Sequence, residues 1–192
     1  MSLVNKASGG GGGGFQYSPG LIYPSYENRN VAAAPSTSNI DSQTQMVQPF
    51  VPRADVTLDG WAFDSGVASA TSTANGLFAI YDSDLNKVAE GDLGPSPTLI
   101  LGVNSFDLNA SVSLTANALY FLNIYQNGTF MRGSSVEQYS AVDVPYPPDW
   151  PFPANTASLF NSGVIASMPA TLGLDDFTRD NNFPWIGLRI AT

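Results

Sequence analysis

The feature that most constrains the fold is a repeated pattern of short apolar runs. From Val47 onwards, apolar runs of about four to eight residues are separated by Gly, Pro, Asn and Asp at intervals of about ten residues. Such runs are typical of β-strands, and their regular spacing indicates a sandwich or a barrel. Charged residues make up only 12% of the chain, and lysine occurs only at Lys6 and Lys87. Because exposed helix positions are usually filled by charged residues, we expect an all-β domain.

Apolar runs and alternation predict individual strands. These strands lie at 77–81, near 87–90, at 98–103, at 105–114 and at 186–190. Where apolar residues alternate, every second side chain faces the same way, which indicates a strand buried on one side. The stretch 144–153 contains five prolines. Proline cannot donate to a sheet ladder, so this stretch predicts a rigid crossing loop, with an irregular region from there to Pro184.

The segment DVTLDGWAFD changes its parity halfway along. Val56 and Leu58 share one face of an extended chain, whereas Trp61 and Phe63 have the opposite parity. Two interpretations compete. The Asp-Gly pair could form a tight hairpin turn, or Gly60 could form a bulge that returns the two aromatic side chains to the buried face. We favour the bulge, because a hairpin would leave two arms of only about four residues.

A hairpin is predicted where LYFLNIYQ and TFMR flank the dipeptide Asn127-Gly128. Asn-Gly is the preferred dipeptide of a two-residue type I′ turn, because both of its residues tolerate positive φ angles. We therefore expect these two runs to be adjacent antiparallel strands.

The first 45 residues differ from the rest of the chain. A run of six glycines, Gly9 to Gly14, precedes an aromatic stretch that is marked by prolines. This composition fits a disordered tail. It also fits an extended arm that follows a narrow path on a neighbouring subunit, because glycine tolerates sharp turns. Fixing each glycine costs roughly 1–2 kcal/mol of backbone entropy, so an ordered arm needs anchoring side chains.

We expect residues 1–45 to be an anchoring arm and residues 46–192 to be the β-sandwich domain. The candidate anchors are the apolar and aromatic side chains of the arm, which could fill pockets on partner subunits. They are Leu3, Val4, Phe15, Tyr17, Leu21, Ile22, Tyr23 and Tyr26.

Composition also argues against several classes of function. The net charge of −9 and the pI of about 4.1 would repel a phosphate backbone, so we expect no nucleic-acid partner. The chain has no cysteine and no histidine, which excludes disulfides, thiol nucleophiles, Cys/His zinc sites and the commonest general base. The opening residues lack the apolar core of a signal peptide, and no run of about 18 apolar residues occurs. We expect neither secretion by this route nor membrane insertion.

Paired carboxylates are the remaining catalytic candidates. They are Asp175-Asp176, Asp82 with Asp84, and Asp55 with Asp59. Adjacent aspartates point apart in a strand, and Asp-Ser-Asp is ordinary turn composition, so we expect no enzyme activity. The pattern that begins at Asp82 also resembles a calcium loop, but Lys87 stands where that loop needs glycine, and Leu93 where it needs glutamate. We therefore expect no cofactor and no metal site.

Three aromatic residues near the prolines form a further candidate contact. Tyr146, Trp150 and Trp185 could make a platform for a sugar or for the backbone of another subunit. Alternatively, these rings cover the open edge of the sandwich.

The order of GLFAIYDSDLNKVAEG, LTANALYFLNIY and WIGLRI resembles a group of virion proteins of tailed bacteriophages. The resemblance covers roughly residues 45 to 192. It implies a jelly-roll sandwich of the kind found in tail fibres, head fibres and capsid decoration proteins. From it we expect a capsid decoration or head-fibre protein, bound to other virion proteins as a homotrimer. The protein would be made in the host cytoplasm and lie on the particle surface. The alternative is a tail-fibre or receptor-binding module that binds a host surface glycan.

Overall fold

A computed structural model describes residues 21–22, 41–52, 54–66, 75–94, 97–131, 133–135, 158–180, 182–184 and 186–192. Within these ranges every regular element is a β-strand and none is a helix. The strands are β1 (Leu21–Ile22), β2 (Thr44–Phe50), β3 (Val56–Ser65), β4 (Asn75–Tyr81), β5 (Lys87–Asp92), β6 (Gly102–Leu114), β7 (Tyr120–Asn127), β8 (Gly133–Ser135), β9 (Ser158–Ser162), β10 (Thr178–Asp180), β11 (Asn182–Pro184) and β12 (Ile186–Ile190). The all-β prediction is confirmed.

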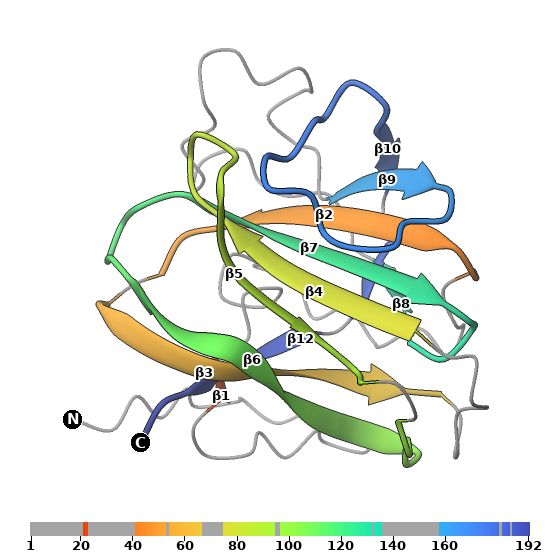
Figure 1. Cartoon of the computed structure of the whole chain (residues 1–192), viewed down its shortest axis with the longest axis horizontal. Helices are drawn as coiled ribbons and strands as arrows, with labels where there is room; N and C mark the ends of the chain where they lie inside the picture. Colours follow the sequence, from red (N-terminus) through yellow and green to blue (C-terminus); the bar gives the residue numbers. More distant parts are fainter. Residues whose placement is uncertain are drawn as a thin grey trace.

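The strands form two main sheets that pack together (Figure 1). The smaller sheet has the order β1-β12-β3-β6, and the larger sheet has the order β10-β9-β2-β7-β4-β5. Strands β8 and β11 form a separate pair. All of these pairings are antiparallel. The described part of the chain is therefore a two-layer sandwich of antiparallel sheets.

The layer between the two sheets is an aromatic core. Trp61 of the smaller sheet stacks on Phe78 of the larger sheet, with ring centroids 5.0 Å apart and an interplanar angle of 10°. Phe63 stacks on Phe106 within the smaller sheet at 5.8 Å and 6°. Large aromatic side chains contribute the most buried apolar area per residue, so this group holds the two sheets together.

The parity change in β3 is a bulge, as predicted. β3 is a single strand, and its register with β6 and β12 shifts between Leu58 and Gly60. Leu58, Trp61 and Phe63 are all fully buried in the core. The extra residue at the shift turns the second half of the strand over, so that apolar side chains on both sides of it reach the same layer.

One lateral side of the sandwich is closed by a close approach of β5 to β6. These strands are the outermost members of their respective sheets. A Cβ atom added to Gly91 of β5 would lie 2.7 Å from the carbonyl oxygen of Asp107 and 3.0 Å from the indole nitrogen of Trp61. Only glycine fits at this contact, so the two sheet edges cover each other here.

The hairpin predicted at Asn127-Gly128 is wrong. Both edges of β7 are already paired, one with β2 and the other with β4, so no position beside it is left for the following residues. The chain instead crosses to the other sheet, where Met131 forms a bridge with Ser65. The Gln126 side chain stabilises this crossing, because its carbonyl oxygen accepts a hydrogen bond of 2.9 Å from the Met131 amide.

Two further sequence predictions need correction. Residues 98–101 are not part of a strand, since β6 begins at Gly102. The region predicted to be irregular before Pro184 contains three short strands, β9, β10 and β11. These strands have no more than five residues each, which leaves too few positions for an alternation to be recognised. The proline-rich stretch 144–153 lies outside the described residues.

The N-terminal region enters the smaller sheet at β1. The backbone of Leu21 pairs with Arg189, and that of Ile22 pairs with Leu188, both in β12 of the same chain. β2 then begins at Thr44. The remaining six candidate anchors of the arm lie outside the described residues.

Candidate interaction surface

A solvent-exposed apolar loop is the most unusual surface feature of the described residues. We define the apolar loop as residues 97–103, which lead into the start of β6 (Figure 1). Ile100 and Leu101 each expose 60% of their surface, and Val103 exposes 40%. Leu99 is 1% exposed and belongs to the core between the sheets. The loop is therefore anchored by one buried leucine while its other large side chains point into solvent.

Asn104 holds the apolar loop in one conformation. Its side-chain oxygen accepts a hydrogen bond of 2.9 Å from the Ile100 amide. Its side-chain nitrogen donates to the carbonyl oxygens of Ile100 and Gly102, both at 2.8 Å. Asn104 is only 7% exposed, so these bonds are largely shielded from competition by water. The exposed side chains are thus presented by a loop whose shape is already set.

The apolar loop carries no charge. Residues 97–105 contain neither acidic nor basic side chains, although the whole chain has a net charge of −9. The cross-strand partner of Val103 is Asp64, which is 3% exposed and therefore does not place its charge on the surface. A contact made through this loop would need no desolvation of charged groups from the loop itself.

A polar hollow lies at the opposite end of the β3–β6 pair. It has a volume of about 360 Å³ and is lined by residues 55–57 and 113–115. The Asp55 carboxylate accepts a hydrogen bond of 2.8 Å from the Ala116 amide, and the Thr57 and Ser113 hydroxyl oxygens are 3.0 Å apart. This hollow presents hydroxyls and one carboxylate, which are groups that can bind a hydroxyl-rich ligand.

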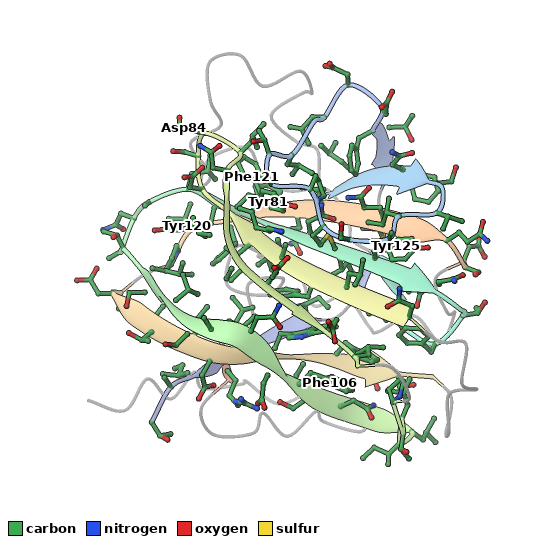
Figure 2. All side chains as sticks on the ribbon, viewed as in Figure 1. Tyr81, Asp84, Phe106, Tyr120, Phe121 and Tyr125 are labelled. Carbon is green, nitrogen blue, oxygen red and sulfur yellow. The ribbon has the colours of Figure 1, made fainter. Side chains whose placement is uncertain are left out.

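The outer face of the larger sheet is covered by the segment 163–177, which we call the covering segment. Figure 2 shows Tyr81, Phe121 and Tyr125 along the part of the larger sheet that this segment crosses. These three residues and the segment's buried side chains form a second apolar cluster. The cluster members from the covering segment are Met168, Leu172, Leu174 and Phe177. The outer face of this sheet is therefore an interior layer and not a free binding face.

Hydrogen bonds attach the covering segment to the β4–β5 hairpin. The Tyr81 hydroxyl donates to the Pro169 carbonyl at 2.9 Å, and the Lys87 ammonium donates to the Met168 carbonyl at 2.9 Å. Burial raises the pKa of the Tyr81 hydroxyl above its ordinary value, because ionisation would place an anion in an apolar layer. Tyr81 is thus kept in the protonated form that can donate this bond.

An ion-pair group lies on the outer side of the smaller sheet. Arg189 binds the Asp59 carboxylate at 2.7 Å and the Asp107 carboxylate at 2.5 Å. These hydrogen bonds raise the pKa of Arg189. A Cβ on Gly60 would lie 2.5 Å from the guanidinium carbon, so glycine at the bulge also leaves space for this side chain. The group joins β12, β3 and β6 across the sheet.

The acidic candidates have structural roles where hydrogen bonds show one. The Asp82 carboxylate accepts from the amides of Asp84 and Asn86, at 3.0 and 2.9 Å, and so closes the β4–β5 turn. Asp175 and Asp176 are exposed in a turn. Across the described ranges no group of three or more acidic side chains could hold a metal ion. Nor does any helix in them have the length and apolar character needed to cross a membrane.

The other predicted site residues are not brought together. The candidate glycan or subunit contacts Tyr146, Trp150 and Trp185 lie outside the described residues, so they stay predictions. Sequence reasoning missed the apolar loop because its alternation was interpreted as a strand. The signal that could have identified it is the absence of charge over residues 97–105 in an acidic chain.

No protein-family model matches this chain, and no curated protein matches its sequence. Its function is therefore argued from the fold and from these surfaces.

Proposed function

We propose that this chain is a structural protein on the surface of a virus particle, of the capsid decoration or head-fibre type found in tailed phages. It acts by binding neighbouring subunits and not by catalysis. Its domain is a jelly roll, and its N-terminal arm anchors it to other virion proteins.

The observation that supports this proposal is the strand order. A jelly roll is a long antiparallel hairpin of eight strands that is rolled into two sheets, and viral capsid domains commonly use it. In such a hairpin the first strand pairs with the eighth, the second with the seventh, the third with the sixth and the fourth with the fifth. If β8 to β11 are an insertion, the pairs β1–β12, β2–β7, β3–β6 and β4–β5 correspond to these four, and all are antiparallel.

The position of β1 supports the proposed arm. β1 is an outermost strand of the smaller sheet and pairs only with β12 among the described strands. The residues before Leu21 therefore precede the first strand of the sandwich, and four candidate anchors lie among them. These are Leu3, Val4, Phe15 and Tyr17.

Deletion of residues 1–20 tests the proposal, because it ends one residue before β1 and removes no described strand. We expect the truncated chain to keep its thermal unfolding midpoint and to be lost from particles that are assembled with the other virion proteins. The matched control is replacement of residues 9–14 by six serines, which keeps the length and all eight candidate anchors. Normal incorporation of the truncated chain would contradict the anchoring role.

The second candidate function is a glycan-binding module for host attachment, and the polar hollow at residues 55–57 and 113–115 is the observation that favours it. A glycan array probed with the purified chain tests this function. Loss of binding in Ser113→Ala would assign the ligand to the hollow, whereas loss in Trp150→Ala would assign it to the predicted aromatic platform. No binding on the array would count against this function.

A further inference from the structure

The apolar loop is a preformed contact surface. Isolated exposed apolar side chains are common on soluble proteins, but here three of them lie within four residues and are held by one buried asparagine. Together, Ile100, Leu101 and Val103 expose on the order of 300 Å² of apolar surface, which equals the largest patch on many monomers. A patch of this size in a fixed conformation is typical of an interaction site.

We infer that the occupant of this surface is the same loop of a second copy of this chain. The argument rests on charge. A cationic partner would be attracted to the exposed carboxylates of this acidic chain and would gain nothing from the uncharged stretch 97–105. A partner that is itself acidic can approach closely only where charge is absent. A second copy has the same net charge of −9, so the apolar loop is the surface where two copies meet with the least repulsion.

The size of the loop sets the strength of this contact. Two facing loops would bury about 600 Å² in total, whereas stable protein interfaces bury about 1,200–2,000 Å². The contact is therefore weak between free molecules. It becomes strong where copies are held side by side, because tethering raises the effective concentration of one loop at the other. Its use in a particle rests on the proposed function, although the contact itself can be measured on the purified chain.

The location of the loop leaves the N-terminal region free. The apolar loop leads into β6 at one edge of the smaller sheet, whereas β1 lies at the other edge (Figure 1). A copy that is anchored near β1 can therefore present its apolar loop to a neighbouring copy at the same time.

Sedimentation velocity of the purified full chain tests the contact. We expect reversible self-association over about 0.1–1 mM, and we expect the double change Ile100→Ser and Leu101→Ser to abolish it. The matched control is Val164→Ser, since Val164 is 69% exposed but lies outside the apolar loop. A wild-type chain that stays monomeric throughout, or a loop variant that associates as well as the wild type, would overturn the inference.

Disulfide trapping provides a second measurement, because the chain contains no cysteine of its own. Under mild oxidation, Leu101→Cys should form covalent dimers about tenfold faster than Val164→Cys at equal concentration. Equal rates would show that the two copies do not meet at the loop. Loss of the truncated chain from particles, together with equal trapping rates, would retain the proposed function and reject this inference.

Discussion

Replacing Asn104 by alanine tests whether one side chain sets the shape of the apolar loop. The change removes three hydrogen bonds, two to Ile100 and one to Gly102. Each such bond contributes about 0.5–1.5 kcal/mol, and the freed backbone groups of a surface loop regain part of this through water. We therefore expect the free energy of opening the loop to fall by about 1–2 kcal/mol, which corresponds to a factor of about 5–30.

Hydrogen exchange measures this opening directly, since the Ile100 amide donates to Asn104. In Asn104→Ala the Ile100 amide should exchange about 5–30 times faster, while amides in β7 keep their protection. The matched control is Asn109→Ala, an exposed asparagine of the same strand, which should leave the Ile100 amide unchanged. An unchanged exchange rate at Ile100 in Asn104→Ala would refute the reasoning.

Two further predictions concern the packing of the sheets. Gly91→Ala should lower the free energy of unfolding by about 1–3 kcal/mol through overpacking at the β5–β6 contact, whereas Gly173→Ala, which meets no atom within 4 Å, should be neutral or stabilise by up to about 1 kcal/mol in urea unfolding. Because the pKa of Tyr81 is raised on folding, the unfolded chain loses this proton first, and stability should fall as pH rises above about 10. Tyr81→Phe should flatten that fall in urea titrations at alkaline pH, and an equally steep fall would contradict the assignment.

The elements that could be predicted are those whose pattern is local. The bulge in β3 was predictable because the parity of its apolar residues reverses within one segment, and β12 because its alternation is unbroken. The hairpin after β7 was not, because Asn-Gly reports only a local turn preference. All seven residues from Tyr120 to Gln126 are buried, and such continuous burial indicates a central strand with neighbours on both sides.

The candidate surface could be predicted only in part. The alternation of Leu99 with Leu101 indicates a strand, but it does not show that the first is buried and the second is exposed. That difference arises from Asn104, whose hydrogen bonds turn the chain before β6 begins. The covering segment was not predicted either, because it packs against residues about 85 positions earlier in the chain. Contacts of that range leave no periodic trace in the sequence.

The position of β12 has a consequence for how the protein is made. β12 lies between β1 and β3, so the first described strand finds its partner only in the last one, and Leu21 pairs with Arg189, 168 positions later (189 minus 21). Closing such long loops is slow, and until the final strand leaves the ribosome one edge of β3 has no partner. Nascent chains that stall before residue 186 would therefore expose a ten-residue strand edge that can pair with other chains.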